Sequence, residues 1–128
     1  MQTETSRGPL TGPEGDGPVP AGGPRWRALL EMRWRDRLQE VTELALAYHE
    51  AEAAAGRGGG EDRLQVQRLQ RRTVASRRAL ADTEEALARL SAGRYGWCES
   101  CAGAIPAPRL AATPETRYCA RCARGWGR

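Results

Sequence analysis

Two stretches with a seven-residue apolar repeat, separated by a glycine-rich break, constrain the fold of this 128-residue chain most strongly. In residues 24–55, apolar positions recur at alternating spacings of four and three residues, at Trp34, Leu38, Val41, Ala45 and Tyr48. In residues 61–92 the repeat continues over eight positions, at Val66, Leu69, Thr73, Ser76, Leu80, Thr83, Leu87 and Leu90. Such a repeat is typical of helices that pair in a coiled coil.

The break at residues 56–60 contains four glycines and one arginine. Glycine commonly ends a helix in a left-handed conformation, and five residues suffice to join two antiparallel helices. Pro24 suits the first turn of a helix, where its missing N–H has no cost. We therefore predict an antiparallel coiled-coil hairpin over residues 24–92 with its tip at residues 56–60. Each helix would be about 48 Å long at a rise of about 1.5 Å per residue.

The composition agrees with a mainly α fold. Aromatic residues make up only 5% of the chain and phenylalanine is absent, so a thick globular core is not expected. The abundance of Ala, Arg, Glu and Leu favours long helices. No run of 18 apolar residues is present, and the N-terminus lacks a basic segment followed by an apolar one. We therefore expect no membrane span and no secretory signal, and a cytoplasmic location.

Residues 1–23 differ from the rest of the chain. They contain six glycines and four prolines and have few apolar side chains. Such a segment cannot bury enough surface to offset the entropy of ordering it. We predict a disordered tail there, in front of the hairpin.

The four cysteines form two pairs, Cys98-x2-Cys101 and Cys119-x2-Cys122, with seventeen residues between the pairs. This pattern is typical of a zinc site with four thiolates, because each short turn directs two sulfurs at one ion about 2.3 Å away. Disulfides are disfavoured without a secretory signal, and redox dithiols without a βαβ pattern. A site closed by four sulfurs has no open position for a reaction, so we predict one structural Zn²⁺. The only histidine, His49, is expected to be solvated or to flank the repeat rather than to bind metal.

Residues 93–128 are thus predicted to form a small zinc finger with a basic C-terminal end. Gly96 and Gly103 are expected to supply the permissive backbone of the first turn. Bulky residues close to the cysteines are expected to pack this module against the start of the first helix. They are Tyr95, Trp97, Ile105, Leu110 and Tyr118 in the module, and Trp26, Leu29 and Leu30 in the helix.

Residues 93–101, GRYGWCESC, resemble the signature of the DksA/TraR zinc-finger family, and residues 84–90 resemble the stem that leads into this finger. The resemblance continues through Ile105, Arg109, Leu110, Ala112, Pro114 and the segment Cys119-Ala120-Arg121-Cys122. It implies a bacterial transcription regulator that binds RNA polymerase rather than promoter DNA. In this family the finger lies at the rim of the polymerase secondary channel, and the coiled coil enters the channel. Some members act with the alarmone ppGpp, and the sequence leaves this open.

The chain departs from the family pattern at two places. Family members carry two aspartates three residues apart at the tip, followed by alanine, whereas here Glu61 and Asp62 are adjacent and Arg63 follows. These acids have a second explanation, because carboxylates in the first turn of a helix interact favourably with its positive end. The glycine that usually follows the second cysteine is replaced by Ala102, and Gly103 comes one position later.

The resemblance and the residues together select Glu61, Asp62, Arg94 and Arg109 as candidate partner-binding residues. An alternative is a zinc-ribbon module that binds nucleic acid through Arg94, Arg109, Arg117, Arg121 and Arg124. A third possibility is a non-enzymatic coiled-coil interaction protein. We expect no enzyme, because no nucleophile–base set, phosphate loop or open metal site is visible. A monomer is expected; the sequence does not decide between activation and repression, or which promoters respond.

Overall fold

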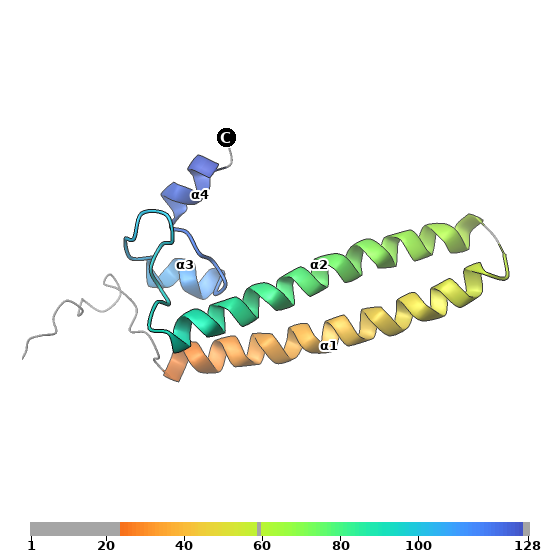
Figure 1. Ribbon diagram of the computed structural model, residues 1–128, viewed down its shortest axis with the longest axis horizontal. Coiled ribbons are helices and arrows are strands. Elements are labelled where there is room, and N and C mark those ends of the chain that lie inside the picture. The colour runs from red at the N-terminus through yellow and green to blue at the C-terminus, as the bar shows by residue number, and fades with distance from the viewer. Residues whose placement is uncertain (1–23, 59, 127–128) are drawn as a thin grey trace, which may run out of the picture. The chain divides into compact units, whose positions relative to one another are not determined.

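The computed structural model describes residues 24–58 and 60–126 of the chain. It contains two long helices, α1 (Pro24–Ala55) and α2 (Gly60–Ser91), and two short ones, α3 (Ala107–Ala112) and α4 (Ala120–Trp126) (Figure 1). Across these residues the only strand-like pairing is an isolated bridge between Trp97 and Ala104. The predicted mainly α hairpin is confirmed, and both long helices lie within one residue of their predicted bounds. The tail predicted for residues 1–23 lies outside the described residues.

The chain divides into two compact units. One unit, the hairpin unit, consists of residues 32–84 and contains most of α1 and α2. The other, the finger unit, combines residues 24–31 with residues 85–126, and so includes the start of α1 and the end of α2. None of the helices in the described ranges has the length and apolar character needed to cross a membrane.

The repeat predicted for α2 is confirmed at all eight positions, each of which is buried or half-buried. Its polar members differ in whether their hydroxyl groups form hydrogen bonds. The Thr73 and Thr83 hydroxyls donate to carbonyl oxygens one turn earlier, at 2.7 and 3.0 Å. The Ser76 hydroxyl is buried and has no hydrogen-bond partner. We call the line of contact between the two long helices the seam. On α2 no predicted seam position is exposed, but few of these positions carry large apolar side chains.

The repeat predicted for α1 is wrong at Leu38, which is 40% exposed. Ala45 is half-buried, but the neighbouring Leu44 is more deeply buried, at only 6% exposed. A second series of buried and half-buried positions keeps the spacing of four and three residues and includes Leu44: Leu30, Trp34, Arg37, Val41, Leu44, Tyr48, Ala51 and Ala55. Arg37 concealed this register, because a charged residue suggests a surface position although its long aliphatic chain can lie against apolar neighbours. The Nε atom of Arg37 is buried and has no hydrogen-bond partner.

The core of the finger unit gathers side chains from both long helices and from the cysteine module. Its buried members are Trp26, Leu30, Ala86, Leu90, Tyr95, Cys98, Ile105 and Leu110, and Leu29 and Tyr118 pack against them. The rings of Trp26 and Tyr95 lie 5.9 Å apart, and the Arg25 guanidinium lies 5.1 Å from the Trp26 ring. The predicted packing of the module on α1 is thus confirmed, except at Trp97, which is 40% exposed.

The corrected register predicts different outcomes for two leucines on α1. Leu44→Ala should lower the free energy of unfolding by about 2–3 kcal/mol, because it leaves a cavity in a buried layer. Leu38→Ala, the matched control, should lower it by about 0.5 kcal/mol, as expected for an exposed side chain. Urea denaturation followed by circular dichroism at 222 nm measures both values. Equal losses for the two variants would contradict the register described here.

Candidate metal centre

The metal centre is approached through a tight turn at the end of α2. Gly93 has φ +76°, and its N–H donates to the Leu90 carbonyl at 3.2 Å. The N–H of Arg94 donates to the Arg89 carbonyl at 2.8 Å. These two bonds form a Schellman motif, which satisfies helix-end carbonyls and requires a left-handed residue at the position of Gly93. The chain leaves the helix here and enters the first cysteine pair.

The first cysteine pair is held by a short network of backbone hydrogen bonds. The Cys98 N–H donates to the Gly103 carbonyl at 2.7 Å, and the Ala102 N–H donates to the Cys98 carbonyl at 2.9 Å. Gly96 adopts φ +92°, as the prediction of a permissive residue there requires. The corresponding expectation for Gly103 is wrong, because the left-handed residue is Ala102, at φ +65°. It occupies the position where the DksA/TraR signature has glycine.

The second cysteine pair lies at the start of α4. Cys119 directly precedes the helix and accepts a hydrogen bond from the Ala123 N–H at 2.9 Å, and Cys122 lies in the first turn. A helical turn thus sets the spacing of this pair, whereas an irregular loop sets the spacing of the first pair.

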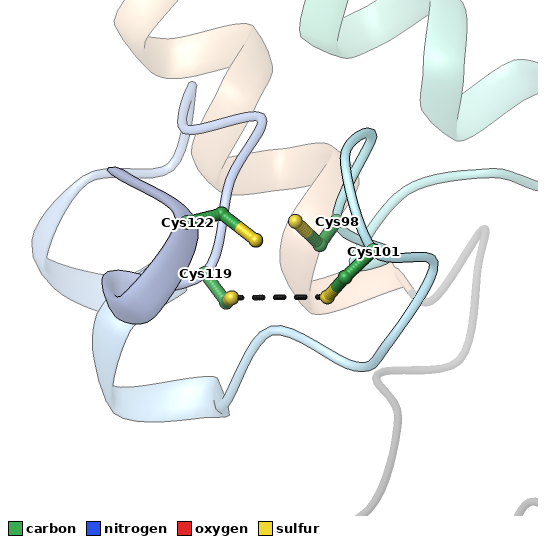
Figure 2. A group of neighbouring side chains, drawn as sticks. All are labelled: Cys98, Cys101, Cys119 and Cys122. Carbon is green, nitrogen blue, oxygen red and sulfur yellow. Dashed lines mark hydrogen bonds between the residues drawn. The ribbon is translucent and has the colours of Figure 1, made fainter. Parts of the chain in front are cut away.

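The four predicted sulfurs come together in the structure (Figure 2). All four Sγ atoms lie within 4.8 Å of one another, and those of Cys101 and Cys119 are 3.9 Å apart. For a tetrahedral zinc ion with Zn–S bonds of about 2.3 Å, each S–S edge measures about 3.8 Å. The donor type, the number of donors and their spacing therefore fit Zn²⁺.

The local environment separates the acidities of the thiols. Burial raises the pKa of Cys98, but backbone groups of Cys101, Cys119 and Ser100 lower it by more, to about 6. The pKa of Cys119 is also lowered, chiefly by a backbone hydrogen bond from Cys122. Ser100 lowers the pKa of Cys122, but the Cys119 thiol and burial outweigh this and raise it to about 11. Crowded sulfurs cannot all become anions easily without a cation among them.

A set of polar contacts fixes the loop between α3 and the second cysteine pair. The buried Tyr95 hydroxyl donates to the Pro114 carbonyl at 2.9 Å. Arg89, on α2 and only 5% exposed, donates to the Glu115 carbonyl at 3.3 Å and lies 3.9 Å from the Glu99 carboxylate. These contacts connect the last turn of α2 to both sides of the metal centre, because Glu99 follows Cys98 and the loop precedes Cys119.

Arg117 and Arg109 hold the same loop. Arg117 forms ion pairs with Glu85 and with Glu99, and the Arg109 Nε–H donates to the Tyr118 carbonyl at 2.9 Å. Two of the five arginines of the nucleic-acid alternative thus have structural roles. The roles of Arg89 and Arg117 were missed from the sequence, because nothing in their spacing indicates which loop carbonyls or carboxylates they meet.

The other predicted site residues are at the surface. Glu61 and Asp62 are exposed in the first turn of α2, in the hairpin unit. Arg94 is exposed and Arg109 is half-buried, both in the finger unit. His49 is exposed, with its ring 6.1 Å from that of Tyr48. The structure does not test whether Glu61, Asp62, Arg94 and Arg109 bind a partner protein, and these roles stay predictions.

The left-handed conformation of Ala102 yields a stability prediction. Ala102→Gly should raise the free energy of unfolding of the zinc-loaded protein by about 1 kcal/mol, because a Cβ atom disfavours this conformation by about that amount. Ala112→Gly, in α3, is the matched control and should lower the stability, since glycine weakens a helix. Thermal unfolding with zinc present measures both. A loss of stability in Ala102→Gly would show that the alanine is not strained.

Comparisons with known proteins agree with this geometry. Residues 93–125 match the family described as "Prokaryotic dksA/traR C4-type zinc finger". A 44-residue segment is 52% identical to an uncharacterized protein of Aquifex aeolicus (strain VF5), and covers 34% of this chain and 30% of that protein. The chain thus spans under a third of the length of this relative.

A solved structure, that of transcription factor DksA2 from Pseudomonas aeruginosa, has the same fold. It superposes with a TM-score of 0.72 at 22% identity, over 80% of this chain and 81% of that one. The sulfur cluster and the C4-type match together support one structural zinc ion in the module. Residues 93–125 thus match a DksA/TraR-type zinc finger, in a chain whose fold matches that of the DksA2 structure.

Proposed function

We propose that this chain is a non-enzymatic bacterial transcription regulator of the DksA/TraR type that binds RNA polymerase through its secondary channel. The observation that carries the proposal is the DksA/TraR-type finger in a chain whose fold matches that of transcription factor DksA2. In this family the coiled coil enters the channel and the finger lies at its rim. A cytoplasmic location follows from the proposed partner.

Within this proposal, Cys98, Cys101, Cys119 and Cys122 hold the zinc ion. Their sulfurs all lie within 4.8 Å of one another, close enough for a single tetrahedral ion to bind all four. The bound ion supplies a crosslink between the two cysteine loops and contributes folding free energy. Other residues of the finger unit hold the module in place. Tyr95 and Arg89 fix the loop before the second cysteine pair. Trp26 and Leu30 pack the module against α1.

The tip acids would carry the regulatory effect. Glu61 and Asp62 are exposed next to the glycine-rich turn, where no neighbouring ion pair among the described residues engages them. In a confined channel their charge would be weakly screened, and it would act on nearby cations or basic side chains. Their adjacent spacing differs from that of the family's paired aspartates, so we expect a protein that binds polymerase but has a weak or altered output.

Zinc binding can be tested by substitution at an exposed cysteine. Cys101→Ser should reduce the bound zinc from about one ion per chain and unfold the module, because a structural zinc ion stabilises the folded state. Elemental analysis and near-ultraviolet circular dichroism measure the two effects. Ala120→Ser, next to Cys119 and also exposed, is the control and should retain zinc. A zinc-free protein with unchanged stability would contradict the assignment.

The function can be tested with purified RNA polymerase. The wild-type chain should bind the core enzyme, and Glu61→Ala with Asp62→Ala should bind with nearly the same affinity but lose the effect on initiation. Glu40→Ala with Glu50→Ala removes the same charge from exposed positions of α1 and should behave like wild type. If the tip variant regulates normally, these two acids are not part of the mechanism. If the wild-type chain does not bind polymerase, the proposed function is wrong.

A further inference from the structure

One side of the hairpin unit is hollowed between its two helices. Two neighbouring hollows, of about 650 and 430 Å³, are lined by residues of α1 and α2, and His49 lines both. The larger one includes Gly56 and Arg63, near the tip, and the smaller one includes Ala45 and Arg77, further along the helices. Because they share His49, the two hollows form one groove, which we call the His49 groove.

The heptad spacing explains where the His49 groove lies. On α1 the lining residue Ala45 directly follows the seam residue Leu44, and on α2 the lining residue Gln70 directly follows Leu69. In an antiparallel helix pair, the positions just after the seam lie on the same side of both helices. Small lining residues such as Ala45 and Ala53 leave the space between the helices unfilled.

The charges that line the groove are mainly positive. Arg63 and Arg77 lie near its two ends, about 21 Å apart along α2 at a rise of about 1.5 Å per residue. Within residues 24–58 and 60–126, neither arginine forms an ion pair. Glu52 is the only acid among the described lining residues, and its carboxylate accepts a hydrogen bond from the Tyr48 hydroxyl at 2.9 Å. The two guanidinium groups are therefore available to a partner.

The other side of the hairpin unit has the opposite charge. A smaller hollow there, of about 320 Å³, is lined by Glu50, Asp62 and Gln65, and no arginine is among its described lining residues. Glu50 and Gln65 directly precede the seam positions Ala51 and Val66, which places them on the side away from the His49 groove. The hairpin unit thus has a basic side and an acidic side.

The shape of the His49 groove suits a third helix. Both of its hollows are open to solvent, whereas a small-molecule site encloses most of its ligand. An extended peptide would need main-chain hydrogen-bond partners, but the backbone groups along α1 and α2 already bond within each helix. A helix satisfies its own backbone, and it can pack closely on a helix pair where the contacting side chains are small. A helix of about 14 residues would span the distance from Arg63 to Arg77.

The chemistry of the groove requires that such a helix be acidic. Each guanidinium group can donate two parallel hydrogen bonds to a carboxylate, and the two arginines lie near opposite ends of the groove. Between them, the half-buried Val66 and the 57% exposed Val74 offer apolar contact. An apolar centre with charged groups at its edge is the usual arrangement of a protein–protein interface.

We propose that the His49 groove binds an acidic α-helix of RNA polymerase, with carboxylates of that helix at Arg63 and Arg77 and its apolar side chains on Val66 and Val74. This inference rests on the function proposed above and adds to it the side of the hairpin that meets the partner helix. The acidic side, with Glu50 and Asp62, faces away from that helix. Opposite charges on its two sides thus set the rotation of the hairpin about its long axis when it binds.

The first test is photocrosslinking of the full-length, zinc-loaded chain to core RNA polymerase. The photoreactive amino acid p-benzoylphenylalanine replaces Gln70, which lines the groove, or Gln65, the matched control on the acidic side; both glutamines are exposed on α2. The yield of crosslinked polymerase from position 70 should exceed that from position 65 by about tenfold, because crosslinking requires direct contact. Mass spectrometry should place the crosslink from position 70 in a polymerase segment with net negative charge.

The second test measures the affinity of two arginine variants for core RNA polymerase by fluorescence anisotropy at low salt. Arg63→Gln with Arg77→Gln should weaken binding about tenfold, because two charge pairs at the edge of an interface are lost. Arg71→Gln with Arg78→Gln removes the same charge from exposed positions of α2 that line neither hollow, and should stay within about twofold of wild type. Glutamine keeps the helix propensity, and circular dichroism confirms that each variant is folded.

The outcomes separate this contact from the proposed function. If the wild-type chain binds polymerase and the groove variant binds equally well, the proposed function stands and the groove proposal is wrong. Equal losses in the two arginine variants would indicate attraction through net charge, and stronger crosslinking from position 65 would show that the acidic side meets the polymerase; either result overturns the proposal. So would a crosslink from position 70 to a second copy of the chain. If the wild-type chain does not bind polymerase at all, both proposals fail.

Discussion

The packing of Leu30, Leu90 and Tyr95 into one buried cluster is the interaction on which the rest of the structure depends. These side chains come from α1, from α2 and from the segment leading to Cys98, and each is at most 2% exposed. Burial of each such side chain contributes about 1.5–3 kcal/mol. The five largest fully buried side chains among the described residues all belong to this cluster, where both helices and the cysteine module meet: Tyr95, Leu30, Leu90, Ile105 and Leu110.

The hairpin unit is built differently. Leu44 and Leu69 are its only buried hydrophobic side chains among the described residues. Its remaining seam positions are small, polar or half-buried, and a hydrogen bond from the Trp34 indole to the Glu84 carboxylate, at 3.1 Å, joins α1 to α2. The unit therefore relies on helix propensity and on many small contacts rather than on a core of its own.

How far the sequence predicts this fold differs between its parts. The α2 repeat is predictable in full because polar seam members such as Thr83 keep the spacing of the leucines. The α1 repeat is not fully predictable, because Arg37 occupies a seam position. A charged residue there makes the repeat that includes Leu44 difficult to recognise. The cysteine cluster is predictable because its spacing alone specifies the chemistry. The location of the left-handed residue at Ala102 is not, because a neighbouring glycine is the stronger signal.

The polar network around the metal centre was beyond prediction for another reason. Arg89 meets a carbonyl in a loop 26 residues away, and only the folded path of that loop brings the two atoms together. Hydrogen bonds that depend on loop conformation leave no periodic trace in a sequence. The sequence therefore predicts the metal ligands, but not the side chains that hold their loops in position.

The two orphaned polar groups in the seam, Arg37 Nε and Ser76 Oγ, bear on how the molecule moves. A buried polar group without a partner regains its hydration when the helices separate, which lowers the free energy of opening. Native proteins open locally in cooperative segments, and those with few buried contacts open first. Amides in the middle of α1 and α2 should thus exchange with solvent deuterium through partial opening, while those near Leu90 exchange only on global unfolding. Partial opening in the middle of the pair would change the surface that the two helices present to a partner.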